Sequence, residues 1–315
     1  LAFTKGYFNP QSTQNIRHGA DLFALEGHFQ QSGKQFEVFV GFKKGTKKLV
    51  KFNGKPYERI SDHIGQIPLV IISPTDRDLI SEGSETRRKF IDGIISQSNP
   101  EYLSALITYN QALSQRNALL KYFHKNQVFQ LPSLELYNEL LIENGTFIYN
   151  TRSAFLKQFT EHFKKQYKAI SASEIEDVSI VYESSLNEVS FKDLLASQLE
   201  KDRFAQYSTA GIHKDDLDFL LDGYPIKRFG SQGQQKSFLI ALRFAHYEFL
   251  KSQSEQKPIV LLDDIFDKLD EHRVSRLIGL VKNNFFGQLF ISDTHFNRTE
   301  EVVQQTGQSY QMISL

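Results

Sequence analysis

Two adjacent aspartates, Asp263 and Asp264, are the residues whose placement most directly suggests chemistry. They end the apolar run "PIVLLDD", which predicts a buried strand that carries both carboxylates to its C-terminal end. Ligands of α/β sheets bind at this end of the strands. Neighbouring carboxylates there repel each other and lose solvation unless a cation or a proton compensates. A hard, oxygen-ligating ion such as Mg2+ would do so, whereas the simpler alternative is that one Asp caps the following helix.

A loop rich in glycine and glutamine, "FGSQGQQ" at 229–235, is the second stretch that suggests a ligand. An amphipathic helical pattern follows it over about 234–250. The backbone N–H groups of Ser231, Gly233 and Gln234 can point together because Gly233 has no Cβ. The helix adds the positive end of its dipole. The loop therefore predicts phosphate binding, and the alternative is a capped turn without a ligand.

The elements that position these residues begin with antiparallel strands. Residues 20–72 contain the strand-like stretches "DLFALEGHFQ" and "KQFEVFVGF", followed by "KKLVKFNGKPY" after a turn at Gly45. Short turns between strands predict an antiparallel meander. The apolar run at 67–73 then predicts a buried strand.

A helical hairpin is predicted from about Asn99 to Ile170. Pro132 and Ser133 separate its two stretches, and Ser133 is the expected N-cap of the second. Apolar residues recur seven apart in both stretches, and we interpret this stripe as core packing that needs no cofactor. The residues are Leu106, Leu113 and Leu120, then Leu141, Ile148 and Phe155.

The C-terminal third predicts an α/β arrangement with a parallel sheet. A short strand at 178–184 and a helix at about 190–204 precede it. Two strands predicted to be buried, "KPIVLLDD" and "GQLFISDTH", then flank the helix "EHRVSRLIGLVKN". We expect residues 1–96 and 205–315 to form one head, with residues 97–204 as an inserted helical domain.

The composition excludes several classes of protein. Lys plus Arg and Asp plus Glu both number 37, so the formal net charge is zero and nucleic-acid binding must depend on a local patch. The absence of Cys excludes disulfides, thiolate metal sites and cysteine nucleophiles, and it fits a reducing cytoplasm. No apolar run has the length of a membrane span.

One predicted hairpin, "FKKGTKKLVK" at 42–51, gathers five lysines. Such a patch can neutralise phosphates without reading a nucleotide sequence. The alternative is a solvated sheet edge whose lysines oppose aggregation. The candidates for DNA binding are Lys43, Lys44, Lys47, Lys48 and Lys51.

Four elements in this order resemble the head of an ABC-type ATPase. The 229–235 loop with its helix resembles the signature motif, and "PIVLLDD" resembles the Walker B strand. "DKLD" at 267–270 then looks like the D-loop, and "LFISDTH" ends at His295 as a strand that leads to the switch histidine does. The resemblance implies an α/β head, with an antiparallel β meander and a mainly parallel sheet, that carries an inserted α-helical arm.

Three details make the chain most similar to the RecF family, the DNA-repair members of the SMC/Rad50-like branch. The first is the variant "FGSQGQQ". The segment "GIHKDDLDFLLDG" at 211–223 resembles RecF's Gly-Pro-His-Arg-Asp-Asp stretch, from which Ile212 and Lys214 depart. The segment "SPTDRDLISEGSETRRKFID" at 73–92 resembles its Ser-Pro and Arg-Arg-x-Phe-x-Asp stretch. The resemblance spans nearly the whole chain, although the helical middle matches by layout alone.

By this resemblance, three residues take catalytic or metal-binding roles. Asp263 would help to hold Mg2+, and Asp264 would stand where most ABC ATPases have a catalytic Glu, as the general base for the attacking water. Because Asp is one methylene shorter than Glu, we expect slow ATP hydrolysis. His295 would contact the γ-phosphate, and the alternative is an ordinary loop histidine.

The resemblance also implies that the signature loop acts in trans, closing over ATP held by a second subunit. ATP would then join two heads into a homodimer, and hydrolysis would release them. Asp267 and Asp270 would lie along the seam between the heads. The signature residues that would contact the partner's nucleotide are Ser231, Gln232, Gly233 and Gln234.

A RecF-like protein would be cytoplasmic and would act in recombinational repair, replication and the SOS response. It would bind DNA near junctions of single-stranded and double-stranded DNA, and RecO and RecR would be its partners in loading recombinase on gapped DNA. Arg87 and Arg88 could bind DNA or nucleotide, or form an internal ion pair. The segment 213–216 could be a turn and a helix cap.

Other functions remain as alternatives. The chain could be a non-enzymatic DNA-binding or scaffolding module derived from such a head, although the retention of Asp263, Asp264 and His295 argues against decay. A transporter cassette is disfavoured by the "FGSQGQQ" variant and by the long helical insert. A Rad50 or SMC relative with a long coiled coil is disfavoured because the insert is too short for an extended arm.

The family's Walker A pattern, G-x-x-x-x-G-K-[ST], does not occur in the 315 residues. "LAFTKGYF" looks like the segment after the Walker A helix, so we expect the sequence to start downstream of a P-loop. ATPase activity is therefore expected of the complete protein, and these residues alone should neither bind ATP tightly nor hydrolyse it. A mant-ATP titration that gave roughly micromolar affinity would contradict this expectation.

Overall fold

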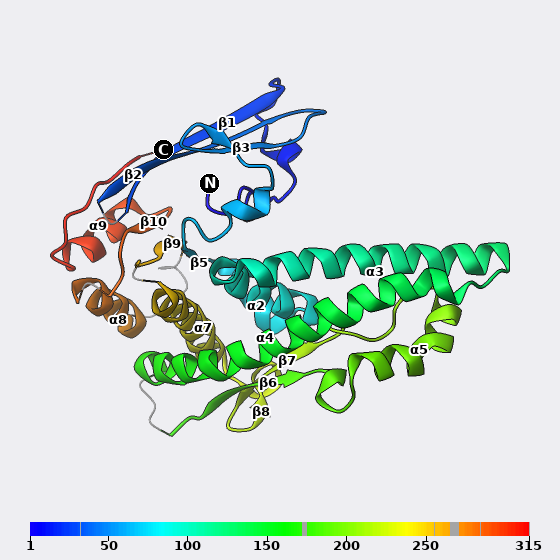
Figure 1. The fold of residues 1–315 in the computed structure, drawn as a ribbon. Helices are drawn as coiled ribbons and strands as arrows, with labels where there is room; N and C mark the ends of the chain where they lie inside the picture. The colour runs from blue at the N-terminus through cyan, green and yellow to red at the C-terminus, as the bar shows by residue number, and fades with distance from the viewer. Residues whose placement is uncertain (32, 172–174, 255, 265–270, 284, 315) are drawn as a thin grey trace.

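Three β-sheets and a long helical hairpin make up the part of the chain that the computed structural model describes (Figure 1). The described residues are 1–315 except 32, 172–174, 255, 265–270, 284 and 315. Within them, no helix combines the length and the apolar character that crossing a membrane requires.

The predicted antiparallel meander is confirmed. Its strands are β1 (Leu22–Gln31), β2 (Lys34–Lys43), β3 (Leu49–Phe52) and β4 (Lys55–Pro56), which pair in sequence order. Alternate residues of a strand face opposite sides. Val38, Val40 and Val50 therefore share the buried inner face of this sheet.

The predicted parallel sheet is also confirmed, and its strands come from both ends of the chain. It contains β5 (Leu69–Ile72), β9 (Ile259–Asp263) and β10 (Leu289–Ser292) in the order β10-β9-β5. The expectation that β10 is buried is wrong, since Phe290 is 51% exposed. This strand lies at the end of the strand order, where one side chain in two faces outward.

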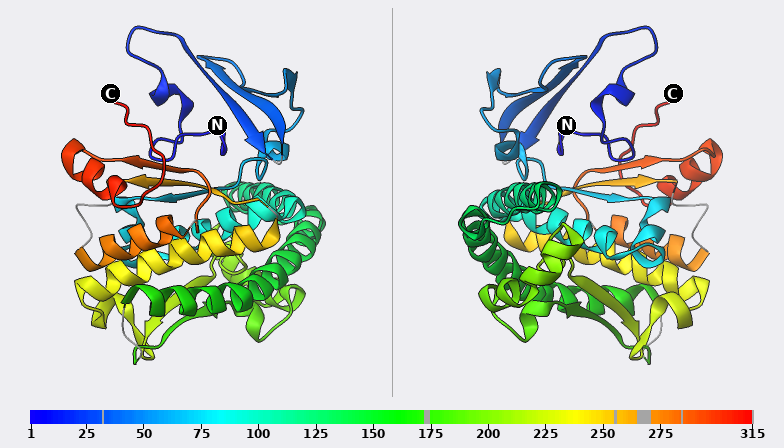
Figure 2. Two further views of the ribbon diagram at one scale, coloured as in Figure 1. Left: turned by 90° about the vertical axis from the view of Figure 1, so that its left-hand side faces the viewer. Right: turned by 90° about the vertical axis from the view of Figure 1, so that its right-hand side faces the viewer.

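The antiparallel sheet packs on one face of the parallel sheet and helices pack on the other, as Figure 2 shows. Leu69 and Ile71 of β5 pack in one cluster with the inner face of the antiparallel sheet. Val70 and Ile72, which point the other way, join the main core with α7 (Gln232–Gln253). In Figure 2, α7 and α8 (Glu271–Lys282) lie on this second face.

The predicted helical hairpin is confirmed as α3 (Pro100–Asn126) and α4 (Leu131–Ser171). Gln127 ends α3 in the left-handed conformation. The prediction that Ser133 caps the second helix is wrong, because α4 already begins at Leu131. Pro132 fits there because the first turn of a helix needs no intrahelical N–H donor.

The base of the hairpin packs into the same core as α7, and a third sheet lies against both. That sheet contains β6 (Val178–Glu183), β7 (Asp216–Leu221) and β8 (Tyr224–Pro225), all antiparallel. Phe238 of α7 contacts Phe163 of α4 and Phe219 of β7, with ring centroids 4.6 and 5.4 Å away. α5 (Phe191–Ala205) runs along the hairpin.

The remaining elements are short or connect these layers. They are α1 (Asp78–Ser81), α2 (Ser84–Ser98), α6 (Ile226–Phe229) and α9 (Phe296–Gln304), with 3-10 turns at Ser12–Asn15, Ile60–His63, Pro74–Arg77 and Ser185–Asn187.

A buried arginine joins the hairpin to the head. Arg152 of α4 is 1% exposed, and its Nε and Nη2 donate to the carboxylate of Asp92 of α2, both at 3.0 Å. Its Nη1 donates to the carbonyl of Ile212 at 3.0 Å and lies 3.4 Å from Asp215 Oδ2. Burial raises the pKa of Asp215, and the hydrogen bond from Tyr182 and the charge of Arg152 oppose this effect.

Replacing Arg152 with Met should destabilise the protein strongly, because Asp92 and Asp215 would remain in place without their cation. Breaking a buried ion pair from one side costs about 3–5 kcal/mol. Urea denaturation followed by circular dichroism measures the loss. Lys157→Met, at an exposed position of the same helix, is the matched control. A loss below about 0.5 kcal/mol for Arg152→Met, as for an ordinary surface change, would contradict the assignment.

Candidate functional site

Asp263 and Asp264 lie at the C-terminal end of β9, the middle strand of the order β10-β9-β5. Asp263 is the last residue of the strand, and its Oδ1 accepts a hydrogen bond from the hydroxyl of Ser292. Ser292 ends β10 and stands opposite Asp263 in the parallel register. The sequence thus delivers the Asp pair to the expected edge.

Asp264 has an unusual backbone conformation and an unsatisfied side chain. Its φ of 47° lies in the left-handed region, which Asp tolerates at a cost. Its N–H donates to the carbonyl of Ser292 at 3.0 Å, which holds the residue against the end of β10. Its Oδ1 is buried and has no hydrogen-bond partner among the described residues. Strain and an unsatisfied buried acceptor at one residue are features of a functional site.

This pair fits a hard cation. Mg2+ prefers carboxylate and water oxygens, and it commonly takes one or two carboxylates from the protein. Asp263 and Asp264 offer such oxygens, and the buried Oδ1 of Asp264 needs a positive partner.

His295 follows β10 and lies beside the same edge. It is the N-cap residue of α9, and its backbone N–H donates to Asp293 Oδ1 at 2.8 Å. The side chain of Asp293 is 1% exposed and pairs with Arg298 at 2.8 Å. This half-buried pair fixes the turn that carries His295, and His295 itself is exposed.

The predicted signature loop is a capped helix start. Ser231 is the N-cap of α7: its hydroxyl accepts from the N–H of Gln234 at 3.2 Å, and its own N–H donates to Gln234 Oε1 at 2.7 Å. This is a capping box with Gln at its third position. The expectation that the Ser231 and Gln234 amides point toward a ligand is therefore not met in this structure. Both are satisfied within the turn.

Further contacts fix the loop in place. The side-chain amide of Gln235 donates to the carbonyls of Gly230 and Ile226, at 3.0 and 3.3 Å, which ties α6 to the first turn of α7. Farther along α7, Arg243 forms a buried ion pair with Asp76, in the turn after β5. The helix is thus anchored to the parallel sheet that carries the Asp pair.

The structure brings most of the predicted nucleotide residues to one side of the molecule. Figure 2 shows the first turn of α7 on the same side as α9, which follows β10. Asp263, Asp264 and His295 follow the C-terminal ends of β9 and β10 at one edge of the sheet. The first turn of α7, which contains the signature residues Ser231, Gln232, Gly233 and Gln234, lies on that side of the molecule. The predicted seam residues Asp267 and Asp270 lie outside the described residues.

The lysine hairpin forms as predicted, between β2 and β3, but its lysines differ in exposure. Lys43 and Lys47 are exposed, and Lys51 lies over the Phe39 ring on the outer face of the sheet. Lys44 pairs with Asp21 at 3.8 Å. Lys48 instead donates to the carbonyl of Thr4, and its burial and the nearby Lys5 lower its pKa.

Arg87 and Arg88 take the internal role that the sequence left open. Arg87 donates from Nε and Nη2 to the two carboxylate oxygens of Asp216, at 2.7 and 2.9 Å. Arg88 donates to the backbone carbonyl of Asp215. Both arginines thus anchor the strand start of β7 to α2.

The segment 213–216 is a turn that leads into β7, so the expected helix cap is wrong. His213 joins this turn to the hairpin: its Nδ1 lies 2.8 Å from the hydroxyl of Tyr109, and its Nε2 lies 3.1 Å from the carbonyl of Ser208. Burial lowers the pKa of His213 to about 4, so the ring is neutral at pH 7. In the neutral ring, Nε2–H donates to Ser208 and Nδ1 accepts from Tyr109.

The sequence analysis did not identify the residues that position Asp263, His295 and Gln234 through hydrogen bonds and ion pairs. Ser292 binds Asp263, Asp293 and Arg298 hold the turn of His295, and the side chain of Gln234 donates to Glu176 at 2.8 Å. None of these three contacts has a local sequence signal; the capping-box pattern, Ser followed by Gln three residues later, indicates only the turn that carries Gln234.

The chain was compared with known proteins. No protein-family model matches it. It is 53% identical over 315 residues to the DNA replication and repair protein RecF of Flavobacterium johnsoniae, covering all of this chain and 88% of that relative. It is 43% identical over 313 residues to the RecF of Bacteroides fragilis, covering 99% of this chain and 84% of the relative.

The comparison with solved structures also finds RecF proteins. The recombination mediator protein RecF in the RecFOR pathway, solved with ATPrS, superposes with a TM-score of 0.85 at 26% identity over 94% of this chain and 81% of the other. The same protein with ATP gives a TM-score of 0.84 at 26% identity, with 93% and 80% covered. The fold is thus that of a RecF head with its helical arm. Given its identity to these relatives over 88% and 84% of their length, the chain belongs to the RecF family of DNA replication and repair proteins.

Proposed function

We propose that this chain is part of an ATP-dependent homodimer that binds DNA in recombinational repair. The observation that carries the proposal is Asp264, at the sheet edge where α/β proteins bind ligands. Its buried carboxylate oxygen has no hydrogen-bond partner among the described residues. Support also comes from the family, since its RecF members are DNA replication and repair proteins and one of them was solved with ATP.

At this edge of the parallel sheet, each predicted residue would have a separate role in ATP hydrolysis. Asp263 would help to hold Mg2+, which would neutralise charge on the phosphates when bound. Asp264 would accept a proton from the attacking water as the general base. His295 would contact the γ-phosphate. The shorter Asp in place of Glu makes slow hydrolysis the expected outcome.

The signature loop would act on the nucleotide of the second subunit. Its capping box satisfies two amides with neutral side-chain oxygens. A phosphate forms stronger, charge-assisted hydrogen bonds and also gains from the helix dipole at the start of α7. Ser231 and Gln234 would therefore exchange their mutual bonds for bonds to the partner's nucleotide, with Gln232 and Gly233 beside them.

DNA would lie against the exposed lysines of the β2–β3 hairpin. Lys43 and Lys47 are exposed and can neutralise phosphates, Lys51 is half-buried over the Phe39 ring, and Lys48 points inward. By family resemblance, we propose that junctions of single-stranded and double-stranded DNA are the targets and that RecO and RecR are partners. The same resemblance implies a role in replication and the SOS response and a cytoplasmic location. The non-enzymatic scaffold remains the alternative.

Replacing Ser231 with Arg should abolish ATP-dependent dimerisation, because a long cation would fill the space beside the partner's nucleotide. The molar mass is measured by light scattering with Mg-ATP, on a chain extended in front of Leu1 by the family's Walker A segment. The parent should double its mass, and Ser231→Arg should stay a monomer.

Two variants serve as controls. Ser252→Arg, at an exposed position near the other end of α7, should dimerise like the parent. Asp264→Asn should dimerise but hydrolyse ATP about a hundredfold more slowly, as expected when a general base is lost. If Ser231→Arg still dimerises on ATP, the signature loop does not lie at the interface.

Reversing the charge of Lys43 and Lys47 together should weaken DNA binding uniformly across sequences. Two lost phosphate contacts should lower the slope of log affinity against log salt by about two. Fluorescence anisotropy with a gapped duplex at several salt concentrations measures both effects. The matched control is Lys121→Glu with Lys125→Glu, at the far end of the hairpin. Equal losses for both pairs would point to non-specific charge and against the hairpin as the DNA site.

A further inference from the structure

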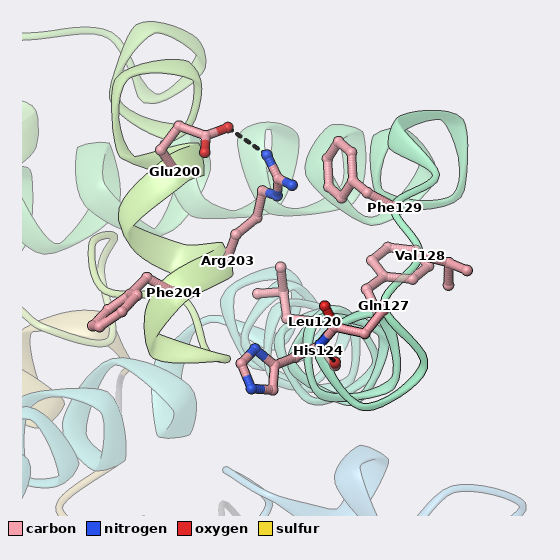
Figure 3. Close-up of a pocket in the computed structure, with 9 residues that line it drawn as sticks. Leu120, His124, Gln127, Val128, Phe129, Glu200, Arg203 and Phe204 are labelled. Carbon is pink, nitrogen blue, oxygen red and sulfur yellow. Dashed lines mark hydrogen bonds and ion pairs between the residues drawn. The ribbon is translucent and has the colours of Figure 1, made fainter.

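The pocket at the far end of the helical hairpin, about 360 Å³ in volume, has no unpaired lysine, arginine or acidic side chain among the described residues that line it (Figure 3). Its one arginine, Arg203, pairs with Glu200 at 2.7 Å. The guanidinium carbon of Arg203 also lies 4.1 Å from the centroid of the Phe129 ring. A group of charged side chains without such a partner lies elsewhere, on the antiparallel sheet.

Glu26, His28 and Glu37 meet on the outer face of the antiparallel sheet. Glu26 and His28 are two residues apart in β1, so their side chains point to the same face. Glu37 of β2 stands directly opposite His28, and its neighbour Val38 faces the buried side. One possible ligand atom of each of the three residues lies within 4.8 Å of the other two. Two strands thus bring two carboxylates and one imidazole together.

Backbone contacts fix Glu37 close to His28. The N–H of Glu37 donates to Asn53 Oδ1, and the carbonyl of Glu37 accepts from the N–H of Asn53, both at 2.9 Å. The N–H and C=O groups of one strand residue point to the same neighbouring strand, so both groups of Glu37 point away from β1. His28 and Glu37 are therefore a non-hydrogen-bonded pair, in which opposing side chains come closer together.

The donor atoms fit a divalent transition ion. His28 Nε2 lies 3.2 Å from Glu26 Oε1. Two ligand atoms that each lie about 2.0–2.2 Å from a tetrahedral Zn2+ are about 3.3–3.6 Å apart. The side chains of Glu26 and His28 are 52% and 76% exposed, so they can rotate to share an ion with Glu37. A mixed set of imidazole and carboxylates suits Zn2+, whereas Mg2+ prefers oxygen ligands alone.

The two glutamates have no fixed cation among the described residues. Glu26 pairs with His28, and neither Glu26 nor Glu37 pairs with a lysine or an arginine. Lys51 reaches the same face of the sheet, but its Nζ lies over the Phe39 ring, 5.5 Å from the centroid. Two carboxylates that share one face repel each other unless a cation compensates them. The group is therefore complementary in charge to a divalent ion.

We propose that Glu26, His28 and Glu37 bind one Zn2+ ion, with water in its open coordination position. Three protein ligands and one open position form a coordination shell that Zn2+ accepts. The ion neutralises both carboxylates and joins β1 to β2 through side chains as well as backbone. The site is on a different sheet from Asp263 and Asp264, so its occupancy requires neither nucleotide nor a second subunit.

The test is isothermal titration calorimetry of Zn2+ into the 315-residue chain without nucleotide. We expect saturable binding of one ion per chain and a melting temperature that rises with Zn2+ concentration. His28→Ala and Glu37→Gln should each raise the Kd about tenfold or more, since even the loss of a residue that only supports a ligand has an effect of this size. Both variants should keep the circular dichroism of the parent, because neither residue belongs to the core.

Two matched controls and a competing ion separate the alternatives. His18→Ala and Glu58→Gln, at exposed positions outside the cluster, should leave the Kd unchanged. Mg2+ in about tenfold excess should not displace Zn2+, because Mg2+ prefers oxygen ligands in octahedral geometry. Absence of saturable binding, equal affinity of the parent and His28→Ala, an equal loss for His18→Ala, or displacement by Mg2+ would each overturn the proposal.

Discussion

The parallel pairing of β5 with β9 is the contact on which the architecture depends. It brings Ile72 opposite Leu262, so the N-terminal and C-terminal segments share one sheet although the whole hairpin lies between them in sequence. One face of this pair is covered by the antiparallel sheet and the other by α7. Because Asp263 and Asp264 follow the last paired residues directly, any shift in register would move both carboxylates away from the edge.

Buried ion pairs then connect the layers around this sheet. Arg243 ties α7 to the turn after β5, and Arg152 ties α4 to α2 and to the turn before β7. Each cation loses much of its hydration, so these contacts contribute little net stability compared with apolar packing. Their geometric specificity is the more important effect, because an arginine fork accepts few arrangements of its carboxylate partners. They fix the helix positions that packing alone would leave free to slide.

Much of this fold follows from local patterns in the sequence. Alternation and turn residues predicted the meander, apolar runs predicted β5 and β9, and the Ser231–Gln234 spacing held a capping box that the structure contains. The contacts that support the candidate site were harder to predict from the sequence, because they join residues that are far apart in it. Arg87 reaches Asp216 across 129 positions, and no local rule predicts such a partner. The left-handed backbone of Asp264 and the exposure of Phe290 likewise depend on neighbouring strands rather than on their own sequence.

The bond from Gln234 to Glu176 links the start of α7 to the segment between α4 and β6. Gln234 uses Oε1 for the N–H of Ser231 and its amide nitrogen for Glu176, just before β6, and Glu176 also accepts from Tyr167 near the end of α4. A side chain with both ends engaged cannot turn toward a new acceptor without releasing at least one of them. A ligand that displaced Gln234 from the helix start would therefore also remove one of the bonds that hold Glu176 beside the end of α4.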